Sequence, residues 1–453
     1  MCELTRRGFL VGCSAGVAAM AGARFNTVAF AQGGGGENDE ILVVIFLRGG
    51  MDGLHVVMPI DGVDRGFYEA ARPTLQIPVT GPGAALPLDA QFGLHPSAGP
   101  LFDLFQNGNL SIVQAMGLTE VNRSHFDAMQ QVERGLQSSS GAPSGWLARH
   151  LASASNLPPE MIVPSLAVGG LQPTSLLSSL ETLNLSDPGQ FNINTGPWLW
   201  RHPQRTALRR LWGADSTFLH TTGLQAMDAM DIIELYVDDD YTPANGAVYP
   251  QSDFGDHLQI LAQMTKLDLG LQVATLDVGG WDTHAGQGQG SGGYFASLIE
   301  DLASGLGAFY LDLDGSGSAN FTSRLTVVVH SEFGRELREN SDSGTEHGYG
   351  NLMMVLSGNA IGGLHGTWPG LAPGQLVDGT DVAVTNDFRR ILSEVLIRRL
   401  ANPQLGLIFP GYGDYQPLGI VQGEDLPPIY GDQPLFEDGF ETGDTSRWST
   451  SVG

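Results

Sequence analysis

The chain has only two cysteines, Cys2 and Cys13, and both lie inside a segment that we interpret as an export signal. Residues 1–31 carry a twin-arginine pattern, TRRGFL, then a weakly apolar Gly/Ala-rich run and an Ala-Phe-Ala cleavage site. Cleavage before Gln32 would leave a mature chain without thiols, which excludes cysteine nucleophiles, disulfides and cysteine-bound metals. A lipid anchor on Cys13 is disfavoured, because almost no apolar residues separate it from the arginines.

Basic residues are also scarce. Lys266 is the only lysine, and the 22 basic residues face 49 acidic ones, for a formal charge of −27. This charge repels nucleic acids and anionic lipids, so we expect neither as a partner, and a bound anion must be held by arginine, backbone amides or metal. We expect no transmembrane helix in the mature chain. Its predicted location is periplasmic or secreted, and its predicted partner during export is the twin-arginine translocase.

Short apolar runs rich in β-branched residues recur and end in glycine turns with polar residues. We expect buried strands at residues 41–47, 271–278 and 325–330. A predicted helix over 96–106 and a predicted strand over 110–114 follow the first of them, and this β-α-β order implies parallel strands. We therefore predict an α/β fold, a three-layer αβα arrangement around a mostly parallel central sheet, within residues 41–420.

Three segments depart from this pattern. Residues 32–40 form a Gly-rich linker, and about 137–250 are rich in Ser, Gly, Pro and Asn, which favours an insertion or cap over the sheet edge. Residues 421–453 form an acidic C-terminal tail. We interpret its end either as a sorting motif or as a disordered extension.

Carboxylates and imidazoles gather where the predicted strands end. Asp282 and His284 follow the strand over 271–278 in GGWDTH, and Asp52 follows the first strand in FLRGGMDGLH. Ligands bind at the C-terminal edge of such sheets, and Asp and His are ordinary ligands of divalent metals. In the alternative interpretation, both aspartates form turns and His284 is a capping or surface residue.

Ser124 begins SHFDAMQ, a capping-box-like start for an amphipathic helix that runs to about Arg134. The hydroxyl of Ser124 could serve only as an N-cap. A serine at a helix N-terminus also lies where backbone amides stabilise an anion, and a nearby metal would make it a nucleophile.

These stretches occur in an order that resembles a known family. The leader, FLRGGMDGLH, SHFDAMQ, GGWDTH, SEFGR, EHG and TNDFRRIL resemble the exported bacterial proteins catalogued as domain of unknown function family 1501, which is similar to the alkaline phosphatase and sulfatase superfamily. The resemblance spans most of residues 41 to about 418. It implies an alkaline phosphatase-like fold.

In that superfamily, two divalent metals and a nucleophile lie at the C-terminal edge of the sheet. By this resemblance Ser124 is the nucleophile, and the metal ligands are Asp52, Asp282, His284, Glu332 and His347. Phe333 occupies the place of another histidine ligand. The second metal site therefore lacks a ligand unless His55, His125 or Glu346 substitutes.

The resemblance implies an exported metal-dependent hydrolase of phosphate or related esters, with a small anionic ester as substrate. Zinc is the expected ion, and manganese, calcium and magnesium are alternatives. The metal would lower the pKa of the Ser124 hydroxyl, and Arg48, Arg123 and Arg335 are the expected clamps for the phosphate oxygens. The lack of a cysteine excludes the cysteine-derived formylglycine used by most sulfatases.

Two other functions fit the sequence. One is a non-catalytic secreted or envelope-associated binding protein that keeps the fold with a degraded metal site. The other is a single-metal site that binds a carbohydrate or a sulfate ester without turnover.

Overall fold

The structure is a computed structural model that describes residues 38–137, 142–158, 161–179, 181–187, 198–237 and 241–431. The expected export signal over 1–31 with both cysteines, most of the linker and the end of the acidic tail lie outside these residues. None of the described helices combines the length and the apolar character that a membrane crossing requires.

The centre of the chain is a nine-stranded sheet with the order β13-β5-β12-β9-β1-β8-β6-β7, in which β14 also pairs with β5. The strands are β1 Ile41–Leu47, β5 Leu110–Gly117, β6 Ser165–Val168, β7 Thr182–Leu185, β8 Val273–Val278, β9 Leu325–His330, β12 Asn351–Ser357, β13 Gly363–His365 and β14 Asn386–Asp387. Within this described sheet, β12 runs antiparallel to β5 and β9, and the other pairings are parallel. The predicted, mostly parallel sheet is confirmed.

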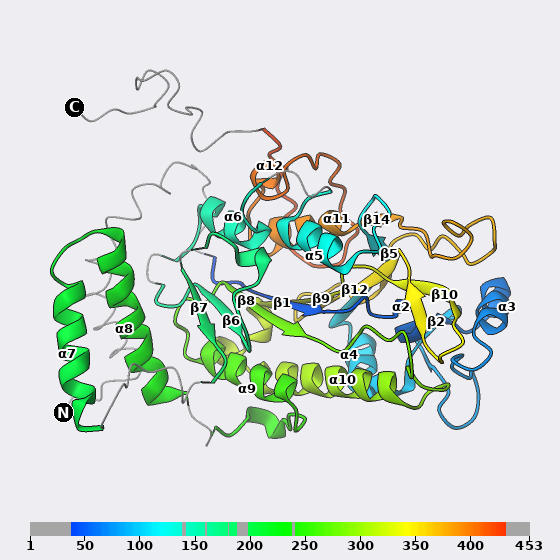
Figure 1. Cartoon of the computed structure of the whole chain (residues 1–453), viewed down its shortest axis with the longest axis horizontal. Coiled ribbons are helices and arrows are strands. Elements are labelled where there is room, and N and C mark those ends of the chain that lie inside the picture. Colours follow the sequence, from blue (N-terminus) through cyan, green and yellow to red (C-terminus); the bar gives the residue numbers. More distant parts are fainter. Residues whose placement is uncertain are drawn as a thin grey trace.

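Helices cover both faces of the sheet, and the side chains of β1 contact the helices on each face. All seven residues of β1 are buried, and successive side chains point to opposite faces. Its odd-numbered residues belong to one apolar cluster with α4, α9 and α10, and its even-numbered residues belong to another with α5, α6 and α11. Figure 1 shows these helices on opposite sides of the sheet. The three-layer arrangement follows.

The helical bounds agree closely with the sequence pattern where that pattern is strong. The α-helices are α2 Gly53–Val56, α3 Gly62–Ala71, α4 Gly99–Gln106, α5 His125–Arg134, α6 Trp146–Ser153, α7 Arg201–Trp212, α8 Phe218–Tyr236, α9 Asp253–Lys266, α10 Tyr294–Leu313, α11 Phe388–Arg398 and α12 Leu405–Ile408. Short 3-10 turns are η2 Pro96–Ala98, η3 Thr174–Leu176, η5 Trp198–Trp200, η6 Ala244–Gly246, η7 Gly317–Ala319 and η8 Thr322–Arg324.

Two small sheets follow the C-terminal ends of central strands along the chain. After β1 come β2 Val57–Pro59, β3 Leu86–Pro87 and β4 Phe92–Leu94, and after β9 come β10 Arg335–Glu339 and β11 Thr345–His347. Along the chain, the antiparallel pair β10-β11 connects β9 to β12 of the central sheet.

The segment expected as an insertion or cap, 137–250, contributes in part to the main sheet. β6 pairs with β8 and β7 pairs with β6, both in parallel, so the central sheet continues into this segment. Its helix α6 packs in the same apolar cluster as α5. The helices α7 and α8 pack against each other as a hairpin (Figure 1). The low apolar content of the loops hid the two short strands.

Candidate metal centre

Five polar side chains from separate segments meet beyond the ends of β8 and β9. Asp282 and His284 follow β8, Glu332 follows β9, His347 ends β11, and His125 begins α5. In the described part of the chain, the ligand atoms of His125, Asp282 and His347 all lie within 4.8 Å of one another. The structure therefore brings together residues that are far apart in the sequence.

The Oδ1 atom of Asp282 is the point on which the cluster converges. The Nε2 atoms of His284, His347 and His125 lie 3.2, 3.4 and 3.5 Å from it. The Nε2 atoms of His284 and His347 are 2.8 Å apart. The buried Arg335 donates a hydrogen bond of 2.6 Å to the same Oδ1 atom, which fixes the orientation of the carboxylate.

Each of the three histidines has an acceptor beside its other ring nitrogen, Nδ1. The distances are 2.7 Å from His125 to Glu332, 2.6 Å from His284 to Glu346, and 2.9 Å from His347 to the carbonyl oxygen of Arg123. Carbonyl oxygens and ionised carboxylates only accept hydrogen bonds, so Nδ1 carries the proton in each ring. The Nε2 atom of each neutral ring then has a lone pair on the side of the cluster.

Lone pairs that approach one another in this way require a proton or a metal ion between them. Nε2 of His125 is buried and has no hydrogen-bond partner, although the Asp282 oxygen lies 3.5 Å away. Histidines whose Nδ1 donates to a carboxylate or carbonyl group are the usual ligands of protein-bound metals, because the outer hydrogen bond fixes the tautomer. The donor set fits a divalent ion that accepts imidazole nitrogen.

The electrostatics of the cluster keep its carboxylate ionised. Burial acts to raise the pKa of Asp282, but the hydrogen bond and charge of Arg335 outweigh burial, and the pKa is lowered. Burial lowers the pKa of His347, and the charge of Arg335 adds to this effect. The hydrogen bond to Glu332 raises the pKa of His125. A proton therefore competes with a metal ion more strongly at His125 than at His347.

The glycine turn after β1 lets two backbone segments approach each other at the centre. A side chain at Gly49 would lie 2.4 Å from the backbone nitrogen of Asp282, and Gly49 has a φ of +124°. Arg335 donates to the carbonyl oxygens of Gly49, Gly50 and Thr345 from its buried position. Glycine is therefore required at position 49 for packing against the turn that carries Asp282.

Asp52, expected as a ligand, has a different set of partners. Its carboxylate is fully buried and accepts two hydrogen bonds from Arg72, of 2.7 and 3.0 Å, and one of 2.8 Å from Gln287. Glu332 is likewise buried, and accepts hydrogen bonds from Ser331 and from the amide of Gly49. The structure places Asp52 in a buried ion pair and Glu332 behind His125.

The arginines expected as substrate clamps already have protein acceptors. Arg335 binds Asp282 and backbone carbonyls, and the other two form ion pairs at distances of 2.6–2.9 Å. The partners are Glu133 and Asp277 for Arg48, and Asp378 and Asp381 for Arg123. Of these, the Arg123 side chain is the most exposed, at 34%.

Ser124 is the N-cap of α5, as predicted, but its side chain makes no capping hydrogen bond. The residue is exposed, and its backbone nitrogen donates to the side chain of Asn122. Its neighbours Arg123 and His125 both contact the cluster, through a carbonyl oxygen and a ring respectively. Ser124 therefore lies at the rim of the centre with a hydroxyl that does not cap the helix.

The sequence analysis did not predict the central position of His125, which was only one of three candidate substitutes for a missing ligand. Phe333 packs against the rings of His125 and His347, with centroids 4.9 and 5.0 Å apart. It acts as an apolar wall for both rings. The available signal was the position of His125 directly after the predicted N-cap, where its ring reaches the same rim.

The comparisons with known proteins show a similarity to one family over part of the chain and say nothing of function. Residues 219–398 match a family model described as "Protein of unknown function (DUF1501)". This range contains Asp282, His284 and His347, whereas His125 precedes it. No curated protein and no solved structure matches the chain. Over 219–398 the chain is thus similar to this family, in agreement with the family resemblance of its motifs.

Proposed function

We propose that the chain is an exported metal-dependent hydrolase of phosphate or related esters, with an alkaline phosphatase-like fold. His125, Asp282 and His347 would hold one divalent ion and leave a coordination position open for water or substrate, with His284 beside them. The observation that carries this proposal is the set of three Nε2 lone pairs around Asp282 Oδ1, each oriented by a hydrogen bond at Nδ1. Imidazole-rich ligation favours zinc over calcium and magnesium.

Ser124 is the proposed nucleophile. A divalent ion at this site supplies Lewis acidity, which lowers the pKa of a nearby hydroxyl and polarises an ester oxygen. The hydroxyl of Ser124 does not cap α5, so the amides of the first helical turn remain available to a bound anion. These amides, rather than the paired arginines, would orient the phosphate oxygens.

A metal-binding protein without turnover is the second candidate function. A zinc ion held by all three histidines and Asp282 would have the four protein ligands typical of closed, structural sites. The 3.2 Å distance between His284 Nε2 and Asp282 Oδ1 favours this arrangement, because it brings the fourth ligand as close as the others.

The first test is the metal content of natively purified chain. About one zinc or manganese per chain is expected in the wild type, and His125→Gln and His347→Gln should lose most of it. His365→Gln is a matched control, since His365 donates only to the carbonyl oxygen of Ile361. Wild-type protein that takes up no divalent metal would refute the proposal.

The second test separates the two functions. Turnover of aryl phosphate mono- and diesters is measured for wild type, Ser124→Ala and the control Ser323→Ala, whose hydroxyl donates to Asn320. A hydrolase that uses Ser124 should lose at least about 100-fold in kcat with its metal retained. Full metal occupancy without ester turnover would instead establish the binding protein.

A further inference from the structure

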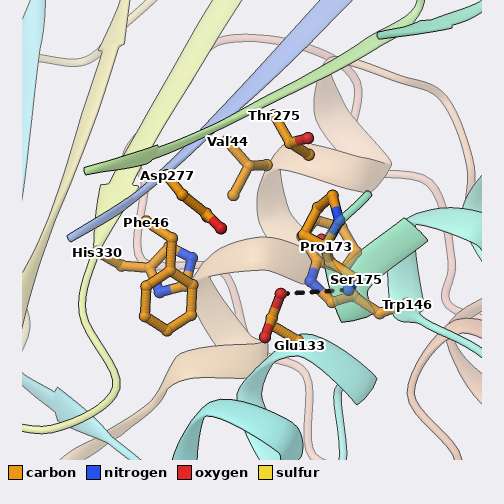
Figure 2. Close-up of a pocket in the computed structure, with 9 residues that line it drawn as sticks. All are labelled: Val44, Phe46, Glu133, Trp146, Pro173, Ser175, Thr275, Asp277 and His330. Carbon is orange, nitrogen blue, oxygen red and sulfur yellow. Dashed lines mark hydrogen bonds between the residues drawn. The ribbon is translucent and has the colours of Figure 1, made fainter. Parts of the chain in front are cut away.

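A second polar pocket lies on the face of the sheet that α5 and α6 cover (Figure 2). Phe46, Asp277 and His330, from β1, β8 and β9, are register neighbours and form its floor. Glu133 of α5 and Trp146 of α6 line the opposite side. The enclosed space is small, about 10 Å³, which is room for roughly one water-sized group, and the pocket opens to solvent.

Two buried polar atoms at this pocket have no partner. Among the residues that the structure describes, Nδ1 of His330 and Oγ1 of Thr275 have no hydrogen-bond partner, although the two residues are only 2% and 4% exposed. Both side chains line the cavity. Buried polar atoms in proteins are nearly always paired, so these two indicate a polar occupant.

The charged groups at the pocket leave one negative charge in excess. Arg48 donates two hydrogen bonds of 2.9 Å to Glu133 and also pairs with Asp277 at 2.9 Å, so a single guanidinium serves two carboxylates. Asp277 is the more accessible carboxylate, with its side chain 44% exposed.

We propose that this pocket binds a small monovalent cation, either an ammonium group or an alkali ion. The excess negative charge favours a cation over an anion. The acceptor atoms of Asp277, Thr275 and His330 can accept hydrogen bonds from an ammonium group or coordinate an alkali ion. The ring of Trp146 lines the same cavity and adds an attractive surface for a cation.

The spacing of the acceptors favours a monovalent over a divalent ion. In the described part of the chain, three His, Asp or Glu ligand atoms lie within 4.8 Å of one another at the metal centre, whereas Glu133, Asp277 and His330 do not form such a group. Divalent ions need ligands at short distances, whereas an ammonium group accepts the longer spacing of ordinary hydrogen bonds. The cation pocket shares no ligand with the metal centre and is independent of the proposed function.

Thermal unfolding at constant ionic strength tests the cation pocket. Potassium, sodium and methylammonium chlorides are titrated against tetramethylammonium chloride, whose cation is too bulky and cannot donate hydrogen bonds. We expect a saturable rise in Tm with at least one of the three small cations. A crystal soaked in thallous ion should show an anomalous peak between Asp277 and Thr275 if the site accepts an alkali ion.

Two variants make the test specific. Asp277→Asn removes the excess charge and leaves the ion pair between Arg48 and Glu133. The cation concentration that gives half of the rise in Tm should increase at least about tenfold. Thr275→Val should increase this concentration by a smaller factor. Asp268→Asn is the control, since Asp268 is a half-exposed carboxylate that pairs with Arg324 outside the pocket.

The outcomes separate the sources of the cation. A rise with methylammonium alone assigns the site to an ammonium group, and a rise with potassium or sodium together with the thallous peak assigns it to an alkali ion. No saturable rise with any small cation, an equal rise with tetramethylammonium, or an unchanged concentration for half of the rise in Asp277→Asn would overturn the proposal.

Discussion

Asp52 and Asp282 both follow a buried strand, yet their carboxylates have different partners. Both oxygens of Asp52 accept from Arg72, and neither side chain of this pair is exposed. Asp282 is half-exposed and meets three imidazoles. A buried carboxylate with a bidentate arginine has its charge neutralised already, whereas Asp282 retains a place for a cation.

The substitution Asp52→Asn should therefore change stability and not metal content. It leaves the charge of Arg72 buried without a counter-ion, and we expect the free energy of unfolding to fall by about 3–5 kcal/mol. Urea denaturation measures this loss, and metal analysis of the folded fraction is expected to match the wild type. Loss of metal at unchanged stability would make Asp52 a ligand instead.

The variant Glu332→Gln tests the hydrogen bond behind His125. Glutamine keeps the volume but weakens the acceptor that fixes the proton on Nδ1, so affinity for zinc should fall about 10–100-fold. Competition with a chelator of known affinity measures the change. Glu339→Gln, which alters a carboxylate bound to Thr74, is the control. Equal affinities for Glu332→Gln and wild type would contradict this role.

The helix α5 links the two candidate sites. Its first residue, His125, belongs to the metal centre, and Glu133 in its last turn lines the cation pocket. Gly135, with a φ of +65°, ends the helix in the left-handed conformation that glycine adopts readily. One amphipathic helix thus positions a side chain at each site.

The hairpin of α7 and α8 is held by ion pairs across its two helices. Arg205 and Arg209 of α7 both bind Asp231 of α8, at 2.8 and 2.7 Å, and Arg209 also binds Asp228 at 2.6 Å. This arrangement assigns the basic face of α7 to the hairpin itself. Because these pairs are partly exposed, salt should weaken them.

We expect Asp231→Asn to loosen α7 without unfolding the main sheet. Removing the shared carboxylate should cost the hairpin about 1 kcal/mol or less per pair and speed amide exchange in α7 several-fold at low salt. Hydrogen exchange with mass spectrometry measures this. Asp215→Asn, in the exposed loop between the helices, is the control. Unchanged exchange in Asp231→Asn would show that apolar contacts alone hold the hairpin.

At the scale of the whole molecule, the acidic charge and the layered core determine what can bind and where. The formal charge of −27 favours cations and disfavours anionic macromolecules. The two apolar clusters on either face of the sheet leave its C-terminal edge as the place where polar side chains gather. Both candidate sites lie at the ends of β1, β8 and β9.

Acid should destabilise this molecule through its buried neutral histidines. Burial lowers the pKa of His95 and of His150 to about 4, from an ordinary value of 6.5. Between these pH values the unfolded chain binds more protons than the native chain, so the free energy of unfolding falls as pH drops from 6.5 to 4. Each histidine contributes roughly 3 kcal/mol to this loss.

Urea midpoints measured from pH 7 to pH 4 test this dependence. His150→Gln should flatten the curve over that window, because glutamine does not titrate and can still accept from Asn402. A slope in His150→Gln equal to that of the wild type would contradict the assignment.

Residue patterns alone predicted the buried strands and the helices that begin near residues 96 and 124, because an apolar run with a glycine turn has few stable environments other than a buried strand. They also placed Asp282 and His284 at a strand end, since that edge is where a parallel sheet leaves polar groups open. They missed β6 and β7, which are short.

Which side chains meet at one point depends on how the chain folds. That Arg72 pairs with Asp52, and that His125 rather than Glu332 faces Asp282, depends on how segments far apart in the chain fold onto one another. The sequence does not distinguish a carboxylate that pairs with an arginine from one that can bind a cation. Its role depends on the partners within a few ångströms, because electrostatic interactions are strongest at that range.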